Sequence, residues 1–115
     1  MFNVVDSNTF NEQVLSAQGM VLVNFWAWWS DECRKMSSLM RKVDGILDEQ
    51  DAIVQIDWDQ QKQFASDLEV IGVPSLLIYV RGDEIARYSG IMSKDELIKR
   101  VLKAKEAFSK KGGVN

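Results

Sequence analysis

The apolar residues of the chain form two kinds of run, and the two kinds alternate along the sequence. Apolar or alternating runs of four to eight residues, rich in β-branched and aromatic side chains, are typical of strands. Such runs occur at residues 2–5, 20–27, 52–56, 76–80 and 84–89. The run at 20–27 is almost entirely apolar, which predicts a central strand covered on both faces.

Between these runs, apolar side chains recur every three or four positions, as on one face of a helix. Short stripes of this kind surround Phe10 and Phe64. In the last helical segment, Ser93 is followed by Glu96, a capping box that places the start of the helix at Ser93. The longest stripe follows residue 30 and consists of Cys33, Met36, Met40, Val43 and Leu47.

The predicted order is β-α-β-α-β-α-β-β-α, which indicates an α/β domain. Arg81-Gly82-Asp83 lies between the last two strand runs and predicts a hairpin turn. No linker interrupts the pattern, so we expect one domain over residues 1–109. Residues 110–115, a lysine pair followed by glycines, are expected to form a flexible tail.

Composition excludes several classes of function. The chain has 14 basic and 17 acidic residues, and this mildly acidic balance argues against nucleic acid as a partner. Cys33 is the lone cysteine and histidine is absent, so we expect no internal disulfide, no metal site and no cofactor. No apolar run approaches the ~20 residues of a membrane helix. With no export signal at the N-terminus, we expect a cytoplasmic protein without membrane partners.

Two loops carry a resemblance to a known family. Residues 20–33 read Met-Val-Leu-Val-Asn-Phe-Trp-Ala-Trp-Trp-Ser-Asp-Glu-Cys. They resemble the second strand and active site of thioredoxins, where the pattern is Phe-Trp-Ala-x-Trp-Cys-Gly-Pro-Cys. Val73-Pro74-Ser75 resembles the cis-proline loop of that family, and Gly82 and Gly90 match glycines around its last hairpin. The resemblance implies a thioredoxin fold, with a five-stranded mixed sheet flanked by four helices and a cis-proline loop at Val73-Pro74.

The resemblance places Ser30 at the position of the attacking cysteine and Cys33 at that of the resolving cysteine. Thiol–disulfide exchange requires a thiolate nucleophile, which a serine hydroxyl does not supply. Serine is, however, among the best helix N-cap residues, so Ser30 preserves the helix while the redox chemistry is lost. Asp31 and Glu32 replace a neutral Gly-Pro pair and put negative charge beside the sulfur, which opposes thiolate formation. Cys33 is thus either a slow monothiol or a half-buried small hydrophobe.

Two amides stand where the family carries a buried charge pair. Asn24 occupies the position of the buried base, an aspartate, and Gln55 that of a nearby lysine. Replacing both removes a costly buried ion pair and leaves a neutral hydrogen bond open to the two amides. The alternative is ordinary drift between charged and amide-bearing homologues.

The family resemblance also assigns peptide binding. The residues it implies for substrate binding are Trp29, Val73, Pro74 and Ile91. The chain adds Trp28, and together with Trp26 and Trp58 these side chains predict an exposed apolar patch suited to protein partners.

Two functional hypotheses follow. The chain is either a thioredoxin-like protein that has lost disulfide turnover and binds protein or peptide clients, or an ordinary protein-disulfide reductase represented by an engineered Ser30 variant. In the second case, with cysteine native at position 30, a thioredoxin reductase is an expected partner.

Overall fold

The computed structural model describes residues 2–112, and within them five strands form one mixed sheet in the order β1-β3-β2-β4-β5. The strands are β1 (Phe2–Val4), β2 (Met20–Trp26), β3 (Ala52–Asp57), β4 (Ser75–Val80) and β5 (Asp83–Ser89). β3 is parallel to both β1 and β2, whereas β4 is antiparallel to β2 and to β5. The predicted α/β architecture is confirmed.

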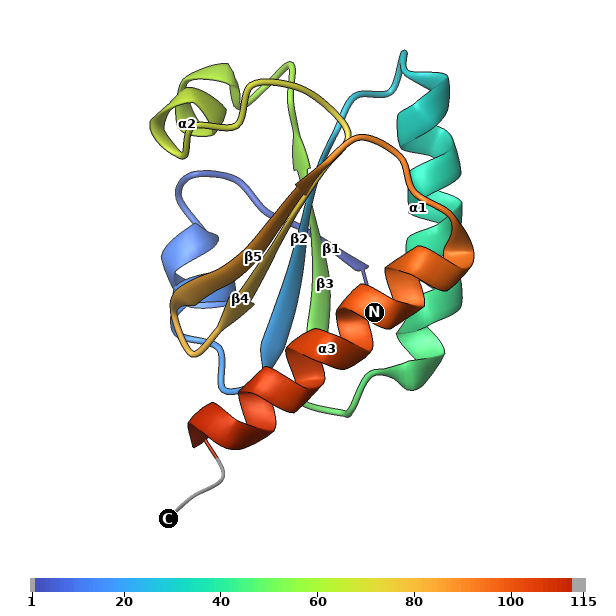
Figure 1. Cartoon of the computed structure of the whole chain (residues 1–115). Coiled ribbons are helices and arrows are strands. Elements are labelled where there is room, and N and C mark those ends of the chain that lie inside the picture. Colours follow the sequence, from blue (N-terminus) through green and yellow to red (C-terminus); the bar gives the residue numbers. More distant parts are fainter. Residues whose placement is uncertain (1, 113–115) are drawn as a thin grey trace.

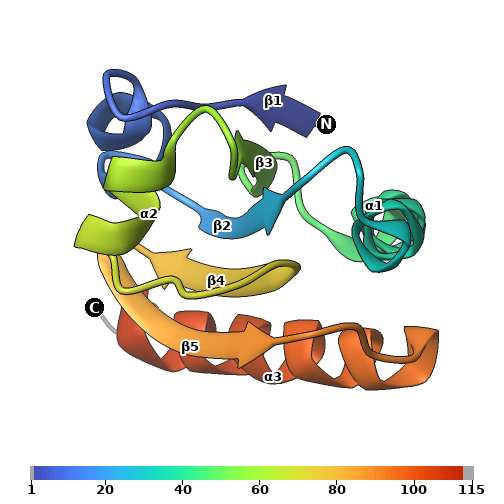
Figure 2. The ribbon, with the colours of Figure 1, turned by 90° about the horizontal axis from the view of Figure 1, so that it is seen from above.

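Helices cover both faces of the sheet. One face carries α1 (Asp31–Val43) and α3 (Lys94–Gly112), and the other carries α2 (Lys62–Asp67) and a π-helical turn at Asn11–Leu15 (Figures 1 and 2). None of the helices within residues 2–112 combines the length and apolar character that crossing a membrane requires.

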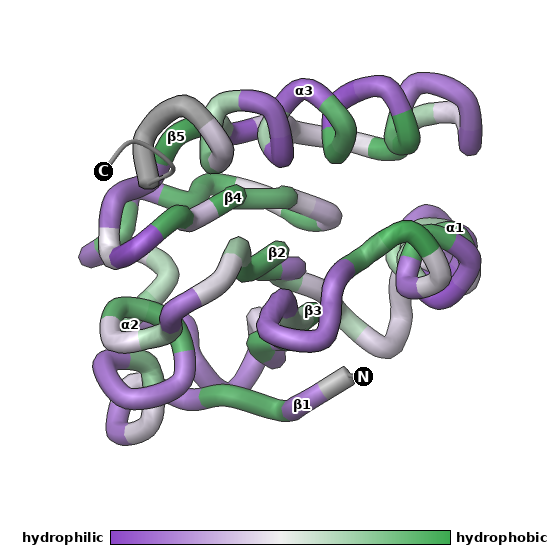
Figure 3. Tube along the Cα trace, turned by 90° about the horizontal axis from the view of Figure 1, so that it is seen from below, coloured by the Kyte–Doolittle hydropathy of each residue, from purple (hydrophilic) through white to green (hydrophobic). Residues whose placement is uncertain are grey.

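The sheet separates two apolar cores. Met20 and Leu22 of β2 pack on the side of α1 and α3, while Val21 and Phe25 pack on the side of α2. All six residues of β4 are buried, as are the first six of β2, because each strand is covered on both faces. In Figure 3, hydrophobic colour predominates along the buried strand β4, whereas hydrophobic and hydrophilic colours alternate along α3.

The predicted hairpin between β4 and β5 is present, but its turn is the two residues Arg81-Gly82, because Asp83 is already the first residue of β5. Both residues have positive φ, 50° at Arg81 and 88° at Gly82. This twist matches that of the flanking strands, and glycine adopts it without a steric penalty.

The helices differ from the sequence expectations in type or in extent. The first helix is a π-helical turn, and the stripe that begins in α1 ends in a short 3₁₀ helix at Asp44–Ile46. α3 continues to Gly112, so the backbone of residues 110–112, which the sequence assigned to the tail, is helical. The remainder of that predicted tail, residues 113–115, lies outside the described residues.

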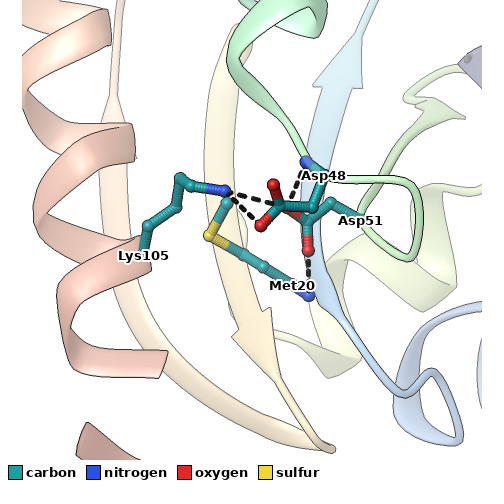
Figure 4. A network of polar contacts seen from close by, with 4 residues as sticks. All are labelled: Met20, Asp48, Asp51 and Lys105. Carbon is teal, nitrogen blue, oxygen red and sulfur yellow. Dashed lines mark hydrogen bonds and ion pairs between the residues drawn. The ribbon is translucent and has the colours of Figure 1, made fainter. Parts of the chain in front are cut away.

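At the end of the sheet where β2 begins, a polar cluster joins three elements (Figure 4). The Asp51 carboxylate, whose side chain is only 1% exposed, accepts hydrogen bonds from the backbone N–H groups of Met20 and Asp48, both at 2.9 Å. Lys105 of α3 contacts Asp48 at 2.8 Å and Asp51 at 3.3 Å. Burial lowers the pKa of Lys105, but the hydrogen bonds and charges of the two aspartates outweigh burial and leave that pKa raised.

Candidate functional site

The candidate site lies at the opposite end of the sheet, where four strand ends meet. β2 ends at Trp26 beside Asp57 of β3, and Phe25 lies opposite Ser75, the first residue of β4. Ser75 is in turn paired with Ser89, the last residue of β5. The loops that leave these ends are therefore neighbours. They contain the predicted residues Trp29, Ser30, Val73, Pro74 and Ile91.

Hydrogen bonds tie these loops together. The N–H of Trp58 donates to the carbonyl of Trp26 at 2.8 Å, and the N–H of Gly90 donates to the carbonyl of Pro74 at 2.8 Å. The Val73–Pro74 peptide bond is cis. Gly90 has a φ of 85°, a conformation that glycine adopts without strain.

Ser30 is the N-cap of α1. Its backbone is extended (φ −95°, ψ 120°), and its Oγ accepts a hydrogen bond from the N–H of Cys33 at 3.2 Å. A helix start leaves several N–H groups without intrahelical partners, and a serine side chain at this position satisfies one of them. The N-cap role predicted for Ser30 is confirmed.

Cys33 lies in the first turn of α1 as a free thiol with no exposed surface. Its burial is complete rather than partial, so a reagent or disulfide in solvent has no direct access to the sulfur. Of the two interpretations of Cys33, this environment favours the packed small hydrophobe.

The two carboxylates that follow Ser30 have different surroundings. Both Asp31 and Glu32 are exposed, but Asp31 forms an ion pair with Arg34 one turn on. Arg34 also donates from Nη1 to the carbonyl of Trp28 at 2.6 Å. The guanidinium therefore offsets the charge of Asp31 near the sulfur. The i,i+3 spacing of the pair was visible in the sequence and points to this contact.

Asn24 and Gln55 are lateral neighbours in the sheet, as register partners of β2 and β3. The hydrogen bond that was open to the two amides is not formed. Gln55 Nε2 instead donates to Oγ of Ser37 on α1 at 3.1 Å, while neither Nδ2 nor Oδ1 of Asn24 has a hydrogen-bond partner among the described residues. The hydroxyl of Ser37 takes the Gln55 amide because α1 packs across this face of the sheet. Sequence reasoning did not identify Ser37.

The predicted apolar patch is present in part. Trp28 and Trp29 are 65% and 54% exposed, and Ile91 is exposed at the neighbouring loop. By contrast, Trp58 and Val73 are half-buried and pack against the core, and Trp26 is half-buried. Pro74 is buried, so its ring does not contribute to the surface.

Ile71 is a further exposed apolar residue on a loop of this site, and sequence reasoning missed it. It is 93% exposed, on the loop that leads to Val73-Pro74. It borders a hollow that is lined by Trp58, Lys62, Ser66, Glu69, Val70 and Ile71. One indication of this exposure was visible in the sequence: Ile71 stands directly before a glycine and outside any strand run. We define the exposed site face as Trp28, Trp29, Ile71 and Ile91.

A hydrogen bond orients Trp29 on this face. Its indole Nε1 donates to Oδ2 of Asp59 at 2.8 Å, and Asp59 lies on the loop that follows β3. Within residues 2–112, no group of three or more His, Cys, Asp or Glu side chains is arranged to hold a metal ion.

Comparison with known proteins gives one consistent result. The family model described as Thioredoxin matches residues 1–103. Thioredoxin of Staphylococcus haemolyticus is 31% identical over 82% of this chain and 88% of its own length. Thioredoxin of Rhodospirillum rubrum is 31% identical over 84% of this chain and 93% of its own length. Among solved structures, a mutant thioredoxin from Halobacterium salinarum superposes with a TM-score of 0.78 at 25% identity, covering 87% of each chain.

Proposed function

Since the chain belongs to the thioredoxin family of thiol–disulfide oxidoreductases, we propose that it binds extended protein segments at the exposed site face without turning over disulfides. The observation that carries this proposal is the environment of Ser30 and Cys33. Ser30 is engaged as a helix N-cap, and Cys33 has no exposed surface.

The chemistry of exchange supports the loss of turnover. A thiolate must attack one sulfur of the substrate, and a second thiol must then release the mixed disulfide. Ser30 cannot form the mixed disulfide, and the sequence holds no histidine to activate its hydroxyl. Cys33 alone lacks a partner to complete the cycle.

The surface supports binding. Large exposed aromatic side chains that lie near one another are typical of protein interaction sites. Trp29 is held in one orientation by Asp59, which reduces the entropy lost when a partner covers it. In this proposal an extended peptide pairs with the backbone of the Val73-Pro74 loop as a short added strand. The clients are therefore expected to be unfolded or extended segments with apolar side chains.

The binding proposal is tested with a permanently unfolded protein, such as reduced and carboxymethylated α-lactalbumin. Replacing Trp28 by serine removes an aromatic side chain whose burial contributes roughly 1.5–3 kcal/mol, so Trp28→Ser is expected to weaken binding about tenfold or more. Leu102→Ser is the matched control, because Leu102 is also an exposed apolar residue but lies on α3. An equal loss in both variants, or no binding by the unaltered chain, would contradict the proposal.

A second candidate is an ordinary protein-disulfide reductase in which Ser30 stands for a native cysteine. It is favoured by the relatives, which are named thioredoxins, and by the position of residue 30 at the start of α1. A cysteine there would lie at a helix N-terminus, which stabilises a thiolate. A thioredoxin reductase would then be a partner.

A further inference from the structure

A carboxylate contacts one of the two exposed tryptophans of the site face. Trp28 and Trp29 are the central residues of a turn, which the N–H of Ser30 closes by donating to the carbonyl of Ala27 at 3.2 Å. Both tryptophan side chains are exposed, at 65% and 54%. The indole Nε1 of Trp29 donates to Oδ2 of Asp59 at 2.8 Å, so a negative charge lies at the edge of an exposed aromatic ring.

The loop after β3 fixes this carboxylate in place. Oδ1 of Asp57 accepts from the backbone N–H groups of Asp59 at 2.9 Å and of Gln60 at 3.1 Å, and these bonds hold the turn that carries Asp59. Asp59 is half-buried, so water screens its charge less than that of a fully exposed carboxylate. A carboxylate offers about four acceptor positions, and the indole of Trp29 occupies one of them. Asp59 therefore retains the capacity to accept a hydrogen bond from a bound partner.

Two cations of the chain lie on neighbouring segments, and each is accompanied by an acid. Arg34 forms an ion pair with Asp31, so its charge is offset. Lys62 and Glu69 line the same hollow with opposite charges. These four charges sum to zero, so Asp59 gives the surroundings of the site face a net negative sign.

An aromatic ring attracts a cation to its face, and tryptophan does so more strongly than the other aromatic side chains. A carboxylate at the edge of the ring offers the same cation a charge-assisted hydrogen bond. We infer that the site face selects extended segments that carry a lysine or arginine, whose cation lies over the ring of Trp29 and contacts Asp59. This inference rests on the proposed binding of extended segments, and it specifies the clients as both apolar and basic.

The test compares short apolar peptides without cysteine, whose central residue is arginine, glutamine or glutamate. Each is titrated onto the unaltered chain, and the NMR shift of the Trp29 indole N–H gives the dissociation constant. We expect the arginine peptide to bind about fivefold more tightly than the glutamine peptide, and the glutamate peptide to bind most weakly. Equal affinity for arginine and glutamine would overturn the inference and leave the proposed function in place. Failure of every peptide and of unfolded α-lactalbumin to bind would overturn both.

Two substitutions of equal charge separate Asp59 from the net charge of the chain. Asp59→Asn keeps an oxygen acceptor for the Trp29 indole but removes the charge, so the preference for arginine should fall to about twofold, the share of the ring alone. Asp67→Asn is the matched control, because Asp67 is an exposed carboxylate of α2 that also accepts one side-chain hydrogen bond, from Gln63 at 2.9 Å. In Asp67→Asn the full preference should remain. An equal fall in both variants, or an unchanged preference in Asp59→Asn, would show that Asp59 does not select the cation and would overturn the inference.

Discussion

The hydroxyl of Ser30 accepts a hydrogen bond from the backbone N–H of Cys33 at 3.2 Å, so the residue that the family resemblance places at the attacking position serves the helix. Ser30→Ala removes this acceptor and should lower the free energy of unfolding by about 1 kcal/mol. Ser30→Asp is the control, because aspartate caps helices as well as serine does. The measurement is the urea midpoint of each variant. Equal loss of stability in Ser30→Asp and Ser30→Ala would show that the capping bond is not what matters.

The complete burial of Cys33 predicts slow chemistry at the sulfur. Iodoacetamide at pH 7 should label the native protein no faster than a free thiol, and should label it much faster once urea unfolds the chain. Mass spectrometry of quenched samples gives both rates. Rapid labelling of the native protein at pH 6 would mean that the sulfur is accessible and ionised, and the packing interpretation of Cys33 would be wrong.

The ion pairs of Lys105 with Asp48 and Asp51 predict that the protein loses stability in alkaline solution. Its pKa is raised in the folded protein because the contacts with Asp48 and Asp51 outweigh burial. A raised folded pKa stabilises the protein below the unfolded pKa of ~10.4, and this contribution is lost as the pH rises through the folded value. Lys105→Met should therefore be less stable than the unaltered chain at pH 7, by an amount on the order of 1–2 kcal/mol. The difference between the two proteins should shrink above pH 10.5.

Tyr79 also makes the stability depend on pH in the alkaline range. Burial, followed by the charge of Glu84, raises the pKa of Tyr79, so its contribution is also lost in alkaline solution. It is present in both proteins and cancels in the comparison. Urea midpoints of the two proteins between pH 7 and pH 11 decide the matter. A difference that does not change with pH would contradict the role given to Lys105.

Much of the fold was predictable because its determinants are local. The apolar run at residues 20–27 reports burial on both faces, and the extended N-cap at Ser30 follows from the residue type. Arg81-Gly82 fixes a hairpin because glycine adopts positive φ without strain. Each of these features depends on neighbours within a few residues.

The contacts that the sequence did not predict depend on packing between distant segments. Asp51 and Lys105 are 54 positions apart and meet only because α3 crosses the sheet. Gln55 turns to Ser37 rather than to Asn24 because of where α1 lies, which the strand pattern does not specify. The exposure of Ile71 follows likewise from the path of its loop, since its residue type is typical of a core.

Restoring a cysteine at residue 30 distinguishes the two functional candidates. If the site has changed as a whole, Ser30→Cys should recover only weak disulfide exchange, because Asn24 cannot accept the proton of Cys33. A positioned base contributes at most about 10²–10⁴-fold, so adding Asn24→Asp should raise the activity further. The double variant should also be less stable by roughly 1–3 kcal/mol, because a carboxylate enters a fully buried position beside Gln55, which carries no charge.

The comparison is between Ser30→Cys and Ser30→Cys/Asn24→Asp, by turnover and by urea midpoint. Full activity in the single variant, with no further activity in the double variant, would show that the serine at residue 30 alone accounts for the loss of disulfide exchange. The candidate of an ordinary reductase with a substituted cysteine would then be the stronger one.

The most direct test of the account is the reduction of insulin by dithiothreitol in the presence of the unaltered chain. Insulin precipitates as its disulfides are reduced, and the onset of turbidity reports the rate. With Ser30 capping α1 and Cys33 buried, we expect the onset to match the dithiothreitol background and the trace given by a Cys33→Ser variant. An earlier onset with the unaltered chain that disappears in Cys33→Ser would show catalysis through this single thiol, and would contradict the central claim that the protein does not turn over disulfides.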